Sequence, residues 1–256
     1  MPAPTGRAGI PAARGELSTG AHYARGVLVL ALDTATPAVT AGVVEVSADA
    51  RGTPGLVTRS VRVAHDGRKH GELLMPAVLA ACEQAVATLR DVAAIVVGAG
   101  PGPFTGLRVG MVTAAALGDA LGVPVHGVCS LDAIAAEAVD AGAVDDPLLV
   151  ATDARRREVY WAAYDARGAR TAGPHVEAPA LLQERLAGLE VTAAAGASAG
   201  GLGLPVVPPA APGPAGLVAC AVDALLSGRR PGPLEPLYLR RPDAVEPGRR
   251  KPVTTP

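Results

Sequence analysis

The hydrophobic pattern of the chain changes its period part-way along, and this change limits the folds that the chain can adopt. The first apolar segments are short runs rich in β-branched residues, separated by turn-forming residues, at 27–32, 38–46 and 56–63. The next segment, at 72–89, carries apolar residues at helical spacing. One stripe of it consists of Leu74, Val78, Ala81 and Ala85. The pattern predicts an antiparallel meander of three strands followed by a helix.

Strands and helices then alternate along the chain. We predict a strand at 93–97, a helix at 106–121, a strand at 124–128 and a helix at 131–138. The order of three strands, helix, strand, helix, strand is that of a ribonuclease-H-like domain, in which helices cover the faces of a mixed sheet. A second unit with a looser pattern begins near residue 140. Its predicted elements are strands at 148–152 and 158–164 and helices opened by proline at 179–186 and 214–226.

These patterns divide the chain into four parts. The two ends mix Pro, Gly, Ala and Arg without periodicity, which is typical of disordered segments. We therefore predict an N-terminal ribonuclease-H-like subdomain and a C-terminal, degenerate ribonuclease-H-like subdomain between two flexible ends. The predicted parts are a disordered extension at 1–26, the subdomains at 27–140 and 141–245, and a flexible tail at 246–256.

The charge balance and the cysteines exclude several classes of protein. The formal net charge is −1, whereas a protein that binds tRNA by itself usually has a strong basic excess, because phosphate contacts dominate its affinity. The three cysteines form no Cys-x-x-Cys pair, which indicates a reducing cytoplasm and argues against a zinc knuckle. The longest uncharged stretch, at 191–222, is interrupted by glycines and prolines and is not a membrane span. We expect a soluble cytoplasmic protein.

A glycine-rich loop at 98–103 joins a predicted strand to the predicted helix at 106–121. Such a junction suits anions, because free backbone N–H groups point out of the start of a helix. The loop matches no phosphate-binding template, since Leu107 and Arg108 stand where a P-loop has Lys-Ser. Two interpretations stay open, a structural turn and a vestigial nucleotide or phosphate loop. The residues of such a loop would be Asp33, Thr34, Gly102 and Thr105.

The helix that follows this loop is apolar around its whole circumference. Its only charged residues, Arg108 and Asp119, lie near its two ends. One face can cover the sheet, and the other needs either the helix at 72–89 or another chain against it. We favour an interface with a partner protein, and internal packing is the alternative. The predicted interface residues are Leu74, Val78, Ala81, Ala85, Leu107, Met111, Ala114 and Ala115.

Six segments, in order along the chain, resemble the bacterial TsaB family, also called YeaZ. They are LVLALDTATP at 28–37, HGELLMP at 70–76, GPGPFTGLRVG at 100–110, GVPVHGVCSL at 122–131, TDARRREVY at 152–160 and PLYLRRPD at 236–243. The resemblance implies an α/β protein with two ribonuclease-H-like subdomains of the actin, Hsp70 and sugar-kinase superfamily. It also implies a heterodimer with the catalytic paralogue TsaD, cooperation with the ATPase TsaE, and support for threonylcarbamoyl transfer to the adenosine beside the tRNA anticodon. Homodimers through the surface that TsaD would occupy are typical of the family.

The residues themselves argue against catalysis by this chain. Members of the superfamily that bind ATP have a glycine in the turn after the first strand, where this chain has Ala35 followed by Pro37. The catalytic paralogue resembles metalloproteins with two histidines four residues apart on one helical face. No such pair occurs among His22, His65, His70, His126 and His175. We expect no metal and no cofactor on this chain, with ATP and metal on the partner subunits.

The sequence therefore predicts a non-catalytic scaffold or activator subunit that binds TsaD and reaches tRNA only through the complex. His70 fits a hydrogen-bonding role at a helix start better than the role of a metal ligand. The arginines at 155–157 either meet phosphate or form a solvated turn. Two alternatives remain for the whole chain, an ATP-dependent small-molecule kinase of the same superfamily and a metallopeptidase.

Overall fold

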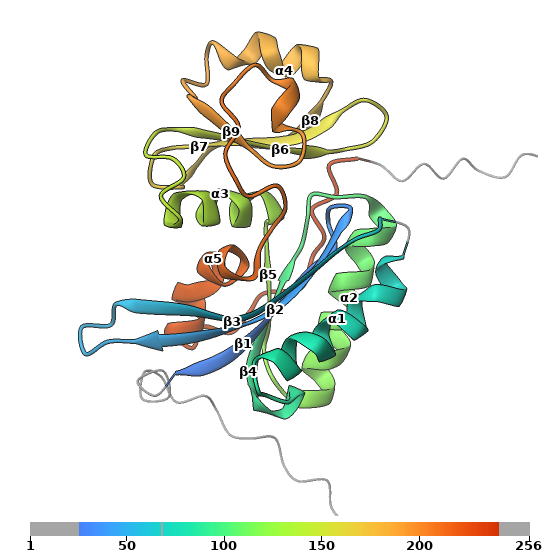
Figure 1. Ribbon diagram of the computed structural model, residues 1–256, viewed down its shortest axis with the longest axis vertical. Coiled ribbons are helices and arrows are strands. Elements are labelled where there is room, and N and C mark those ends of the chain that lie inside the picture. Colours follow the sequence, from blue (N-terminus) through green and yellow to red (C-terminus); the bar gives the residue numbers. More distant parts are fainter. Residues whose placement is uncertain (1–25, 68, 241–256) are drawn as a thin grey trace, which may run out of the picture.

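The structure is a computed structural model and describes residues 26–67 and 69–240. The predicted extension at 1–26, apart from Gly26, and the predicted tail at 246–256 lie outside these residues. Two sheets and five α-helices make up most of the described chain (Figure 1). Each sheet and the helices packed on it form one α/β unit, and the two units lie one above the other in Figure 1.

The first sheet has the strand order β3-β2-β1-β4-β5. Its strands are β1 (Val27–Asp33), β2 (Ala38–Ala48), β3 (Pro54–His65), β4 (Val92–Gly98) and β5 (Val125–Val128). The first three strands pair antiparallel, and β4 and β5 continue the sheet parallel to β1. This mixed sheet confirms the predicted meander and the predicted ribonuclease-H-like order.

Helices cover both faces of the first sheet. On one face lie α1 (His70–Gln84) and α2 (Phe104–Leu121), and on the other lies α5 (Pro214–Leu226) (Figure 1). The alternation of side chains along each strand produces this division, because successive residues point to opposite faces. In β1, for example, Leu30 packs in the core under α1 and α2, whereas Val29 packs under α5.

The second sheet has the order β8-β7-β6-β9, which repeats the order of the first four strands of the first sheet. Its strands are β6 (Leu148–Asp153), β7 (Val159–Tyr164), β8 (Arg170–Glu177) and β9 (Ala193–Ala195). Helix α3 (Ser130–Asp140) packs on one face and α4 (Pro179–Leu186) on the other. Two short 3-10 helices complete the elements, at Leu89–Asp91 and Ala199–Gly201. The predicted fold class is confirmed.

Two helices join the two sheets. Helix α3 precedes the predicted boundary at 140 but packs on the second sheet, and α5 follows that boundary but packs on the first. The two helices also pack closely on each other, since a Cβ on Gly216 would lie 2.0 Å from the carbonyl oxygen of Ala133. The carboxylate of Glu137 accepts hydrogen bonds from the backbone of Gly213 and Gly216, so it caps the start of α5. Burial raises the pKa of Glu137.

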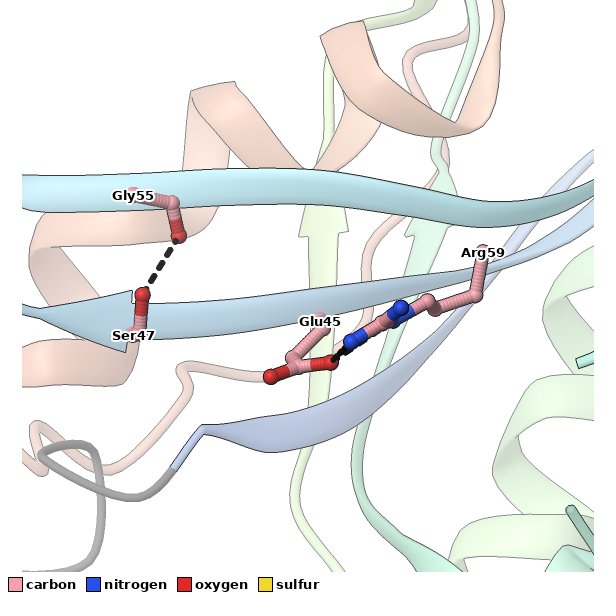
Figure 2. A network of polar contacts seen from close by, with 4 residues as sticks. All are labelled: Glu45, Ser47, Gly55 and Arg59. Carbon is pink, nitrogen blue, oxygen red and sulfur yellow. Dashed lines mark hydrogen bonds and ion pairs between the residues drawn. The ribbon is translucent and has the colours of Figure 1, made fainter.

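Strand β3 forms one edge of the first sheet and carries its own polar contacts (Figure 2). Arg59 lies at a bulge in the β2–β3 pairing and donates to the carboxylate of Glu45 on β2, with 2.7 Å between Nε and Oε2. Ser47 Oγ donates to the carbonyl of Gly55 at 3.5 Å. A bulge and a charged pair at an exposed edge disfavour pairing with a further strand.

Candidate functional site

The turn after β1 is buried where it meets α2 and α3. Asp33 ends β1 and is 0% exposed. Its Oδ1 accepts from the N–H of Ala35 at 2.8 Å, and its Oδ2 accepts from the hydroxyl of Ser130 at 2.5 Å. Ser130 is the first residue of α3, which packs on the second sheet. The Asp33 carboxylate therefore links the first strand of one subdomain to a helix of the other.

Burial shifts the ionisation of this carboxyl group. Removal from water raises the pKa of Asp33 to about 6, and the hydrogen bonds from Ser130 and Ala35 and the nearby His70 offset only part of the effect. At neutral pH the fold thus keeps a buried negative charge, which these donors stabilise.

Thr34 attaches the same turn to α2. Its hydroxyl donates to the carbonyl of Gly106 at 2.7 Å and accepts from the N–H of Gly110 at 2.9 Å. The glycines allow this approach, because a Cβ on Gly102 would lie 2.2 Å from the carbonyl oxygen of Ala35. Backbone of the chain itself therefore packs where a ligand would meet a phosphate loop.

This packing corrects part of the hypothesis of a vestigial ligand loop. Asp33 and Thr34 are buried, and their side chains bind groups of the same chain, so neither is available to a ligand. The structural interpretation of the turn is the one that the contacts support. Gly102 and Thr105, the other two predicted residues, line a cavity beside the turn.

The cavity has a volume of about 460 Å³ and lies between the two subdomains. Its walls come from the start of α1, the start of α2, the turn between β6 and β7, and the segment 238–240 near the end of the described chain. At its rim, the guanidinium of Arg108 lies 3.8 Å from the ring centre of Phe104, and Arg108 Nε donates to the hydroxyl of Tyr238 at 2.7 Å. The rings of Phe104 and Tyr238 stack with their centres 5.1 Å apart.

His70 opens α1 and lines this cavity. It is 8% exposed, and its Nε2 lies 2.9 Å from the carbonyl oxygen of Thr36. Because a carbonyl oxygen only accepts, Nε2 is the donor in this hydrogen bond. This contact agrees with the predicted hydrogen-bonding role at a helix start.

The predicted interface residues lie mainly on the inner side of the helix layer. Most of them are buried, namely Ala81 and the five that pack in the core between the helices and the sheet, Leu74, Val78, Leu107, Met111 and Ala114. Ala85 is half-buried, and Ala115 is exposed. The choice of the buried residues was wrong, because the stripe with the most regular apolar spacing is the one that faces the sheet.

The outer side of α1 and α2 is also apolar. Val112 is 65% exposed and Leu79 is 53% exposed, and Ala115 and Ala116 are exposed beside Val112. We call these four residues the outer helical face. The charged residues of α2 are Arg108 and Asp119, which flank this face. An apolar surface between two charged ends is typical of a protein interface.

Comparisons with known proteins place the chain in a family. Residues 63–208 match the family model described as TsaD, tRNA N6-adenosine threonylcarbamoyltransferase. The chain is 33% identical over 136 residues to the tRNA threonylcarbamoyladenosine biosynthesis protein TsaB of Escherichia coli. This match covers 53% of this chain and 54% of that protein. The chain belongs to this family, in its TsaB (YeaZ) group.

Other comparisons cover more of the chain. An uncharacterized protein of Mycobacterium tuberculosis is 53% identical over 218 residues, or 84% of this chain and 93% of the relative. The solved structure of YeaZ from Pseudomonas aeruginosa has a TM-score of 0.63 and 27% identity, and the match covers 83% of this chain and all of that one. The structural match and the family model agree with the actin, Hsp70 and sugar-kinase type of fold that the resemblance implied.

Sequence reasoning on this TsaB-family chain missed most of the cavity. Tyr160 and Tyr238 line it but were quoted only as part of the resemblance. The segments at 152–160 and 236–243 could have indicated these cavity residues, since both combine arginines with a tyrosine. Across residues 26–67 and 69–240, the His, Cys, Asp and Glu side chains form no group of three or more that could hold a metal ion. No helix within those ranges is long and apolar enough to cross a membrane.

Proposed function

We propose that this chain is a non-catalytic subunit that binds a TsaD-like catalytic partner during formation of threonylcarbamoyladenosine in tRNA. Membership of the TsaB group supports this role, because the E. coli and Bacillus subtilis relatives are named as biosynthesis proteins for that nucleoside. The family model, which is named after the transferase, supports a partner built on the same fold.

The observation that carries the proposal is the outer helical face. Its Val112 and Leu79 are large apolar side chains that stay more than half exposed, although the inner side of the same helices is fully packed. Burial of apolar surface is worth roughly 25 cal/mol per Å². A partner that covers this face with a similar helical layer would build an interface of the usual total size, roughly 1,600 Å².

The structural use of the first turn supports a non-catalytic role. Asp33 and Thr34 hold α2 and α3 in place, and the carbonyl of Ala35 packs against Gly102. In our proposal, the ATP and the metal belong to the TsaD-like partner and to a TsaE-like ATPase. The chain acts in the cytoplasm and reaches tRNA only within the complex.

The test is a pair of charge substitutions on the outer helical face. Val112→Asp and Ala115→Asp each place a carboxylate where the partner would remove it from water. An unpaired buried charge costs at least about 2 kcal/mol, so the Kd for the partner should rise about 30-fold or more. Co-expression with the TsaD-like protein of the same organism, followed by titration of the purified chains, measures this change.

Val206→Asp provides a matched control. Val206 is 59% exposed, close to the exposure of Val112, but it lies beside β9 in the other subdomain. This variant should bind the partner like the wild type. Thermal unfolding of all variants checks that they fold. Wild-type affinity in folded Val112→Asp and Ala115→Asp would remove the proposed surface.

A further inference from the structure

Helices α3 and α5 lie between the two sheets and pack on each other (Figure 1). At the N-cap of α5, a Cβ on Gly213 would lie 2.1 Å from Oε2 of Glu137, in the second half of α3. About one turn further along α5, Gly216 lies against Ala133, which is about one turn earlier in α3. The two helices are therefore antiparallel. Because glycine has no side chain, their backbones are in direct contact at Gly216.

The next turn of this helix pair brings two cysteines together. Cys220 follows Gly216 by four residues, so it lies on the side of α5 that faces α3. Cys129 is the N-cap residue of α3 and precedes Ala133 by four residues, so it lies on the same side of α3 as Ala133. In an antiparallel pair, one turn forward on α5 corresponds to one turn back on α3. The packing of Gly216 on Ala133 therefore places Cys220 opposite Cys129.

The charged groups around the two thiols belong to one cluster. Arg170 Nη1 donates to the Sγ of Cys129 at 3.8 Å and pairs with Oδ1 of Asp132 at 3.6 Å. The surrounding protein raises the pKa of the Cys220 thiol to about 12, and the negative charges of Asp132 and of the Cys129 thiolate contribute to the rise. Arg170 acts on the same pKa in the opposite direction. Charges act in this way on a thiol that lies near them, which agrees with the register of the helices.

The two thiols differ in their access to solvent. Cys220 is exposed, whereas Cys129 is 8% exposed. A reagent in solution therefore reaches Cys220 first, and Cys129 attacks a sulfur that is already bound there. Cys82, the remaining cysteine of the chain, packs in the core under α1 and α2 and lies apart from this pair. An exposed thiol beside a buried one is the arrangement in which the second thiol displaces a reagent from the first.

We propose that Cys129 and Cys220 are a redox modification site, at which a small-molecule disulfide converts the two thiols to one disulfide that joins the subdomains. The thiolate of Cys220 attacks a sulfur of the reagent, a mixed disulfide forms, and one reagent thiolate leaves. The thiolate of Cys129 then attacks the Cys220 sulfur, and the second reagent thiolate leaves as the bond between the cysteines forms. The two departing thiolates take up the two protons that the cysteines lose. The cysteines are oxidised by two electrons, and the reagent is reduced by two.

The disulfide fixes one subdomain against the other, since α3 packs on the second sheet and α5 on the first. It closes a loop that contains the whole second sheet, because β6 to β9 lie between the two cysteines in the sequence. A crosslink over so long a loop restricts the unfolded chain, so the Tm of the oxidised chain should be about 5 °C or more above that of the reduced chain. Since the pKa of Cys220 is about 12, its thiolate is scarce at neutral pH. The exchange should therefore accelerate about tenfold for each rise of one pH unit below that value.

The experiment incubates the full chain with oxidised glutathione and follows the intact mass. The expected product has lost two hydrogen atoms and carries no glutathione, and dithiothreitol restores the original mass. Peptide mapping without reduction should find the peptides of Cys129 and Cys220 linked. A wild-type product that keeps glutathione, a dimer linked through Cys220, or an unchanged mass after a day at pH 9 would overturn the proposal. The site is independent of the outer helical face, so the TsaD-like partner is not needed for this test.

Serine variants of the three cysteines are matched controls. Cys129→Ser should stop at the mixed disulfide with glutathione, because the thiol that displaces it is missing. Cys220→Ser should keep its mass, because the buried Cys129 is not reached from solution. Cys82→Ser should form the disulfide like the wild type, and thermal unfolding of the reduced variants checks that they fold. An equal Tm for the oxidised and reduced forms of Cys82→Ser would refute a bond that joins the two subdomains.

Discussion

The buried carboxylate of Asp33 gives the fold a pH dependence that a single substitution can remove. Asp33→Asn keeps the shape of the side chain and abolishes its charge. The Asn Oδ1 can still accept from Ala35 N–H, and its Nδ2 can donate to Ser130 Oγ. Any change in stability that depends on pH then reports the charge and not the loss of contacts.

The size of the effect follows from the pKa. The pKa of Asp33 is about 6 in the folded chain against 3.8 for the free side chain. Because the folded state binds this proton more tightly, the stabilising contribution is complete below pH 3.8 and is lost as the pH rises through 6. At 1.36 kcal/mol per pKa unit the full loss is about 3 kcal/mol, of which about 2 kcal/mol falls between pH 4.5 and 7.5.

Urea unfolding of wild type and Asp33→Asn at these two pH values measures the effect. The stability of the variant relative to wild type should increase by about 2 kcal/mol from pH 4.5 to 7.5. Asp145→Asn is the control, since Asp145 is exposed between α3 and β6, and its stability relative to wild type should stay constant within about 0.5 kcal/mol. A relative stability of Asp33→Asn that is the same at both pH values, or that falls with pH, would refute the reasoning.

Two further predictions concern packing and association. Gly102→Ala should destabilise the fold by about 1–3 kcal/mol in urea unfolding, because its Cβ would lie 2.2 Å from the carbonyl oxygen of Ala35. Gly71→Ala, in α1 with open space around it, should instead stabilise by up to about 1 kcal/mol, and equal effects of the two would contradict this packing argument. In the absence of a partner, the outer helical face should pair two copies of the chain. Val112→Asp should then lower the mass measured by sedimentation equilibrium to that of one chain, whereas Val206→Asp should leave the mass unchanged. An unchanged mass for Val112→Asp would mean that the two copies pair through another surface.

Periodicity was sufficient to predict most of the fold. The strands of the first sheet and the helices α2, α4 and α5 lie close to their predicted bounds, because turn-forming residues or an opening proline separate each apolar segment from the next. The pattern missed β8, which is interrupted by Gly173 and Pro174, and β9, which consists of three alanines. It also extended α1 to residue 89, although the helix ends at Gln84.

The candidate site was less predictable, for two physical reasons. An apolar helix shows that two faces need cover, but spacing alone cannot tell which face meets the sheet, and this is why Met111 and Ala114 were placed at the interface in error. The cavity depends on Tyr160, Tyr238 and the turn between β6 and β7, which are far apart in the sequence. Only the packing of both subdomains through α3 and α5 brings them together.

The mass of the complex formed on co-expression with the TsaD-like protein tests the central claim most directly. Native mass spectrometry should give one copy of each chain for the wild type and for Val206→Asp, and separate chains for the Val112→Asp and Ala115→Asp double variant. A complex of unchanged mass and abundance with the double variant would show that the partner does not bind the outer helical face.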